Sequence, residues 1–140
     1  MKHIAIILVA VLAILSSCSG EHIASDYDGE LCRDLSIKIE RRDSLTQHDY
    51  SRMIAQDEAI LQYLVDRSRE ICEQPDSLRT EAWRMLTADP EYLERFGYMF
   101  TIGSSLYRAQ QQGLLDESNN EAYDALDKYN EELASYSDRF

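Results

Sequence analysis

A segment of 27 residues, 46–72, contains no glycine and no proline, and its apolar side chains recur every three or four positions. This spacing is typical of one face of an α-helix. The apolar positions are Met53, Ile54, Ile60, Leu61, Leu64, Val65, Ile71 and Cys72. Thr46 with Asp49 predicts a capped start of the helix, and Gln74-Pro75 predicts its end. Other helices must cover the apolar face of a helix this long.

Four further segments show the same spacing, and none shows the sustained alternation of a strand. We expect these helices at residues 26–42, from Asp76 or Ser77 to about Leu86, at residues 90–113, and from Ser118 onward with Glu121 as its capping partner. The sequence therefore predicts an all-α fold, a small bundle of four longer helices and one short helix.

The helix expected at residues 90–113 begins at a strong start signal, Asp89-Pro90, and ends at Gly113. Apolar and aromatic residues cover more than half of its circumference, which predicts that it is the central helix of the bundle. Glu94 and Arg108 interrupt its apolar stretch, so it is too short to span a membrane, which takes about 20 apolar residues. In the last segment a packing seam is predicted from Ala122, Leu126, Tyr129, Leu133 and Tyr136.

The N-terminus has the features of a targeting segment. Met1-Lys2-His3 gives a short positive region, and residues 4–15 form an apolar run too short to cross a bilayer. The run ends in Leu15-Ser16-Ser17-Cys18, which resembles the bacterial lipoprotein signal. That resemblance implies cleavage before Cys18 and attachment of a diacylglycerol through a thioether, usually with a further acyl chain on the new N-terminus. An ordinary cleaved signal peptide that contains a cysteine is the alternative.

The expected organisation has three parts: a signal peptide at 1–17, the lipidated Cys18 with a tether at 18–26, and an acidic helical domain at 27–140. Several acyl chains would hold the protein firmly in the membrane, whereas one chain binds only reversibly. Ser19, not aspartate, follows the cysteine. The lipoprotein resemblance therefore implies a lipid-anchored protein of the cell envelope, in the outer rather than the inner membrane where both exist.

The chain has 14 basic and 26 acidic side chains, a net charge of −12. Such a field repels nucleic acid and anionic lipid headgroups, so neither is an expected partner. It attracts basic proteins and divalent cations, although a solvated acidic surface is the simpler explanation of this composition.

The expected domain is poor in residues for catalysis. Beyond the signal it has only His22 and His48, and the chain contains no HExxH, CxxC or GxSxG motif. We therefore expect no metal site, no cofactor and no enzymatic activity. A tight hairpin of the first two helices would keep Cys32 far from Cys72, which argues against a disulfide, although a splayed first helix or a partner chain leaves pairing open.

Asp57 is the most unusual position, because it falls near the centre of the apolar face of the helix at 46–72. A carboxylate there must be paired or protonated. One interpretation is a ligand-binding pocket around Asp57, with Arg95 and Tyr107 as further binding residues. The other is a structural aspartate that is satisfied by a core arginine such as Arg95 or by the hydroxyl of Tyr50 or Tyr107.

Trp83 lies off the apolar stripe of its helix, so it is expected to be partly exposed and is a candidate interface residue. Acidity, size and the lack of catalytic groups together favour a non-enzymatic protein-binding or accessory module at the envelope, whose partner is an envelope or exported protein. Two alternatives remain open: an immunity-type inhibitor of a basic exported toxin, and a small-ligand-binding or enzymatic domain that uses a pocket around Asp57.

Overall fold

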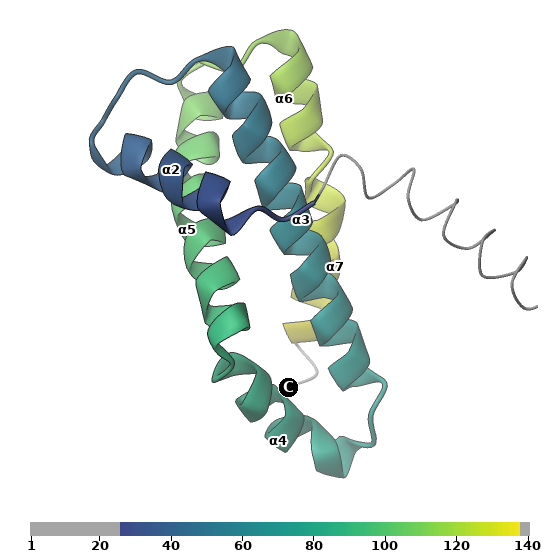
Figure 1. Ribbon diagram of the computed structural model, residues 1–140. Helices are drawn as coiled ribbons and strands as arrows, with labels where there is room; N and C mark the ends of the chain where they lie inside the picture. The colour runs from purple at the N-terminus through teal and green to yellow at the C-terminus, as the bar shows by residue number, and fades with distance from the viewer. Residues whose placement is uncertain (1–25, 138–140) are drawn as a thin grey trace, which may run out of the picture.

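The computed structural model describes residues 26–137, and within that range every regular element is a helix. The helices are α2 (Gly29–Glu40), α3 (Gln47–Cys72), α4 (Asp76–Thr87), α5 (Pro90–Gln111), α6 (Glu117–Asp124) and α7 (Asp127–Ser137). α3 and α5 run antiparallel along the molecule, α4 joins them at one end, and α2 crosses them (Figure 1). The predicted all-α bundle is confirmed. The expected signal, Cys18 and nearly all of the tether lie outside the described residues.

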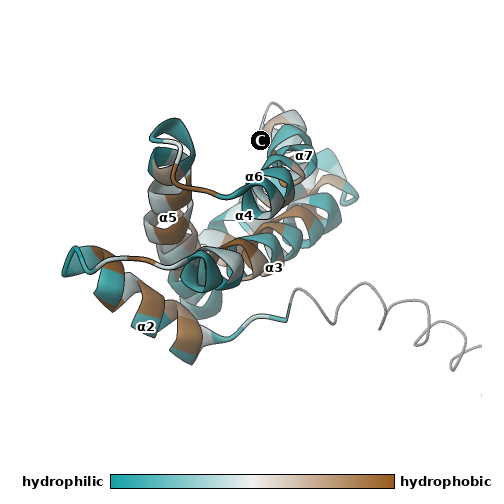
Figure 2. Ribbon diagram, turned by 90° about the horizontal axis from the view of Figure 1, so that it is seen from above, coloured by the Kyte–Doolittle hydropathy of each residue, from teal (hydrophilic) through white to brown (hydrophobic). Residues whose placement is uncertain are grey.

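The central helix is α3, not α5. α3 packs against α2, α4, α5, α6 and α7, whereas α5 makes its main contacts with α2, α3 and α4. Figure 2 shows α5 and the α6–α7 pair on different sides of α3. The prediction that the helix at residues 90–113 is central is therefore wrong, because α5 carries more apolar surface than its neighbours in the bundle cover.

Local signals in the sequence set the ends of the two long helices. Thr46 and Asp49 form the reciprocal capping box at the start of α3, as predicted. The side chain of Asp89 accepts a hydrogen bond from the backbone of α5, and proline follows at the first helical position. Gly113 has a φ of 70°, a left-handed conformation that glycine adopts without steric cost, and it follows the end of α5.

The last predicted helix is divided in two. The helix begins at Glu117, and Asp116 rather than Ser118 caps it. A turn at residues 125 and 126 then separates α6 from α7, so the expectation of one continuous helix is wrong. The packing seam nevertheless passes through the turn, because Leu126 is only 1% exposed and belongs to the core.

The core forms where α2, α3 and α5 meet, together with the turn between α6 and α7. Its most completely buried side chains are Cys32, Leu35, Met53, Ile60, Ile102, Leu106 and Leu126. Cys32 and Cys72 are both buried free thiols, although α2 crosses α3 and does not form the tight hairpin on which the argument against a bridge was based. None of the helices between residues 26 and 137 combines the length and apolar character needed to cross a bilayer.

Candidate functional site

One face of α5 exposes large apolar side chains to solvent. These are Leu93, Phe96, Phe100 and Tyr107, and they are 44–70% exposed. Their spacing of three, four and seven residues places them on one side of the helix. Scattered exposed apolar residues are ordinary on protein surfaces, whereas a row of them on one helix is a candidate surface for contact with another molecule. We call these four residues the α5 apolar face.

A groove of about 240 Å³ lies beside this face. Its lining residues include Leu64 and Ser68 of α3, Phe96 and Met99 of α5, Leu133 of α7 and Trp83 of α4. Trp83 is half-buried, as the sequence predicted, and its ring meets Tyr92 edge to face at 6.3 Å between centroids. The groove therefore continues the α5 apolar face toward the surface of α3.

Asp57 occupies the same face of α3 as Leu64, two helical turns away. It is only 5% exposed, and its Oδ1 atom is buried without a hydrogen-bond partner. Burial raises the pKa of this carboxyl to about 7. The sequence prediction that Asp57 lies in the apolar core stripe is therefore confirmed, whereas the prediction that a core arginine or tyrosine satisfies it is wrong.

The groups that surround Asp57 come from three helices. Gly103 faces it from α5: a Cβ added there would lie 3.8 Å from Oδ1 and 3.9 Å from Oδ2. Burial raises the pKa of the Cys32 thiol on α2 to about 12, and nearby carboxylates, including Asp57, add to this. Burial also raises the pKa of Tyr123 on α6, with the charge of Asp57 as the next cause. No positive charge lies among these immediate neighbours.

Arg95 and Tyr107, the further binding residues predicted around Asp57, differ in their surroundings. The guanidinium of Arg95 lies between the rings of Tyr27 and Tyr63, 4.3 and 4.4 Å from their centroids, and forms an ion pair with Glu91. It is therefore already engaged on the other side of α5. Tyr107 is 60% exposed and belongs to the α5 apolar face.

We expect Arg95→Ala to destabilise the domain by about 1–2 kcal/mol, because two cation–π contacts and the packing of a side chain that is 16% exposed are lost. Chemical denaturation measures this change. Arg84→Ala is the matched control: Arg84 pairs with Glu81 but is 68% exposed, so its loss should leave the denaturation midpoint nearly unchanged. Equal midpoints for the two variants would show that the stacking of Arg95 contributes nothing.

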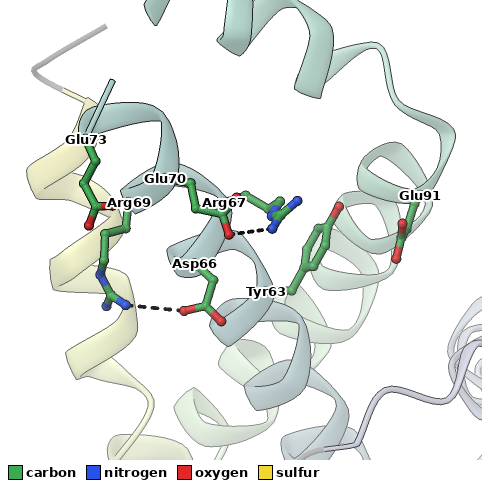
Figure 3. Close-up of a pocket in the computed structure, with 7 residues that line it drawn as sticks. All are labelled: Tyr63, Asp66, Arg67, Arg69, Glu70, Glu73 and Glu91. Carbon is green, nitrogen blue, oxygen red and sulfur yellow. Dashed lines mark hydrogen bonds and ion pairs between the residues drawn. The ribbon is translucent and has the colours of Figure 1, made fainter. Parts of the chain in front are cut away.

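A second hollow, of about 410 Å³, is polar and open (Figure 3). Arg67 pairs with Glu70 at 2.6 Å, and Arg69 pairs with Asp66 at 3.5 Å. These side chains are 42–62% exposed, so the pairs contribute little energy and define a solvated surface. Within residues 26–137 no three histidine, cysteine or acidic side chains are grouped as metal ligands, and His48, the one histidine of that range, is exposed.

Comparison with known proteins gives no matching family model, no matching curated protein and no matching solved structure. The candidate site therefore has to be interpreted from its own chemistry. It consists of the α5 apolar face, the groove beside α3 and an unpaired carboxyl that faces Gly103.

Proposed function

We propose that this chain is a membrane-anchored lipoprotein of the bacterial cell envelope whose helical domain binds another protein through the α5 apolar face. The anchor would be the acyl chains on Cys18, as the resemblance of residues 15–18 to a lipoprotein signal implies. The observation that carries the proposal is the exposure of Leu93, Phe96, Phe100 and Tyr107 on one side of α5.

The composition of this face supports a protein partner. Aromatic residues are enriched at the centres of protein interfaces. Phenylalanine has no polar group that could hydrogen-bond to water, so its burial by a partner is favourable. The partner would cover the side of α5 that α2, α3 and α4 leave open. Because the chain carries a net charge of −12, a partner with basic residues around its apolar contact would be complementary.

The apolar face favours an accessory subunit over an immunity-type inhibitor. Binding that depends mainly on buried apolar area persists in salt, whereas binding that acidic steering dominates weakens as the ionic strength rises. An inhibitor of a basic toxin would therefore lose most of its affinity between low salt and about 0.5 M salt, where screening acts within a few ångströms. An accessory subunit would keep its affinity.

The test is crosslinking in cells and recovery of the full-length, C-terminally tagged protein, followed by mass spectrometry. We expect one partner in near-stoichiometric amount, and we expect its loss with Cys18→Ala, which removes the anchor. The double variant Leu93→Ser with Phe100→Ser should also lose the partner while it folds normally, since both side chains are exposed.

The matched control is Leu78→Ser with Met85→Ser on α4. Leu78 and Leu93 are both 53% exposed, and Met85 and Phe100 are 63% and 70% exposed, so the two double variants remove similar exposed surface. Only the α5 variant should lose the partner. Equal loss in both variants would argue for nonspecific apolar capture, and a partner that tolerates the α5 variant would contradict the proposal.

A further inference from the structure

The position of Gly103 gives the contact between α5 and α3 a specific chemical feature. α5 and α3 are antiparallel, and Phe96 of α5 and Leu64 of α3 both line the groove. Seven residues after Phe96 on α5 is Gly103, and seven residues before Leu64 on α3 is Asp57. These two residues face each other. Gly103 also lines a hollow of about 550 Å³ with Tyr107 and Arg108, so it lies between this hollow and the carboxyl. Glycine is unfavourable inside a helix, and here its missing side chain leaves room for a further heavy atom at contact distance from the carboxyl oxygens.

Within residues 26–137 no positive charge compensates the carboxyl of Asp57. The pKa of Asp57 departs from its ordinary value because of burial, and no positive charge lowers it. α2 presents the thiol of Cys32 and α6 the phenol of Tyr123, while α5 presents Gly103. Arg108 is exposed, and no ion pair joins it to Asp57. A buried carboxylate without a partner is costly, and a cation that reached it would supply the missing partner.

We propose that Asp57 receives the ammonium group of a lysine that the partner protein inserts beside Gly103 when it covers the α5 apolar face. This inference rests on the proposed function and specifies its partner: an apolar segment that carries one lysine. Lysine fits better than arginine because its four-carbon stem can pack against Tyr107 in the hollow beside Gly103 and its ammonium is a compact charge. The planar guanidinium would need several acceptors, and the site offers one carboxylate.

The first test repeats the capture experiment with three single variants. Asp57→Asn removes the charge and keeps the shape. Gly103→Ala places a methyl group against both carboxyl oxygens at ordinary contact distance, whereas Gly97→Ala, on the same helix, meets nothing within 4 Å. The two substitutions change helix propensity equally, so a difference between the two variants must come from the groups that the added methyl contacts. We expect Asp57→Asn and Gly103→Ala to reduce the recovered partner at least tenfold and Gly97→Ala to leave it unchanged.

The second test measures the site without the partner. The full-length protein in lipid nanodiscs is heated with n-butylammonium chloride, and n-butanol with sodium chloride serves as the uncharged control. We expect n-butylammonium to raise the melting temperature of the wild type and of Gly97→Ala, and we expect no shift in Asp57→Asn or Gly103→Ala. A lysine of the captured partner should then be required: its replacement by methionine should reduce recovery as much as Asp57→Asn does.

The outcomes separate the two proposals. If the Leu93 and Phe100 double variant loses the partner while Asp57→Asn retains it, the proposed function stands and the lysine site is wrong. If the wild type captures no partner, the proposed function fails. In that case an increase in melting temperature with n-butylammonium that depends on Asp57 would still establish a cation site. The absence of any increase would overturn the proposed cation site.

Discussion

Replacement of Asp57 by asparagine is expected to make the domain more stable by about 2–4 kcal/mol at pH 8. The carboxyl is 5% exposed, its Oδ1 atom has no hydrogen-bond partner, and burial raises its pKa to about 7. Asparagine has nearly the same shape and carries no charge, so it resembles the protonated acid. The measurement is urea denaturation of both proteins at pH 8 and at pH 4.

The gain should depend on pH in a defined direction. In the unfolded chain Asp57 has a pKa near 4, so between pH 4 and 7 the unfolded state releases its proton while the folded state keeps it. The protonated carboxyl therefore contributes stability below about pH 4, and this contribution is lost as the pH rises to about 7. Wild type and Asp57→Asn should be nearly equal at pH 4 and differ most at pH 8.

The groups that face Asp57 do not titrate between pH 4 and 8. The difference in stability between wild type and Asp57→Asn therefore reports on the carboxyl of Asp57. The pKa of Cys32 is raised to about 12, mainly by burial, and that of Tyr123 is also raised, so both stay neutral between pH 4 and 8. Asp34→Asn on α2 is the control for general relief of negative charge, because Asp34 is exposed. A loss of stability in Asp57→Asn at pH 8 would show that the carboxylate has a partner.

A stabilising substitution at a buried position indicates that the residue is kept for a reason other than folding. Functional sites commonly retain groups that reduce stability. Asp57→Asn is thus a useful variant for the partner experiment, since a more stable protein that no longer binds cannot have lost binding through unfolding. Stability and capture together test whether this carboxyl serves recognition.

The sequence was sufficient to predict the burial of Asp57 and insufficient to predict its isolation. Helical periodicity determines which residues share a face, and Asp57 shares one with Leu61 and Leu64. It does not determine which partner approaches that face. Arg95 was a reasonable candidate, but its contacts with the rings of Tyr27 and Tyr63 depend on how α3 and the segment before α2 pack against α5. Such long-range geometry has no local signal.

The helix ends show the same distinction. The capping box of Thr46 with Asp49 and the Asp89-Pro90 start could be predicted, because capping depends on residues close in sequence. The central position assigned to the helix at residues 90–113 was wrong, because a broad apolar surface indicates that something covers a helix and does not say whether its own chain does. The break near Ala125 was also missed, since the apolar seam continues through it to Leu126.

The second large effect is expected at Asp49, where Asp49→Ala should destabilise the domain by about 3 kcal/mol. Asp49 is 3% exposed and accepts hydrogen bonds from the backbone of Thr46 at 3.0 Å, from Arg52 at 2.8 Å and from Lys38 at 3.1 Å. The substitution removes half of the capping box and leaves two cations without their shared carboxylate. Thr46→Ala, which removes the other half, should cost only about 1 kcal/mol. Equal costs would mean that the two ion pairs are unimportant.

Asp49 and Asp57 should together shift the pH of greatest stability to the acidic side. The backbone of Thr46, followed by Arg52 and Lys38, holds the pKa of Asp49 well below its usual range, so its contribution is present above about pH 4 and is lost as the pH falls. The contribution of Asp57 is lost as the pH rises from about 4 to 7. The summed contribution of these two groups is therefore greatest at about pH 4. In Asp57→Asn the free energy of unfolding should change less between about pH 4 and 7 and should be unchanged in its pH dependence below about pH 4. In Asp49→Ala the free energy of unfolding should be lower above about pH 4 and should change less below about pH 4. If wild type and Asp57→Asn show the same pH dependence of stability between about pH 4 and 8, measured by denaturation, burial does not raise the pKa of Asp57.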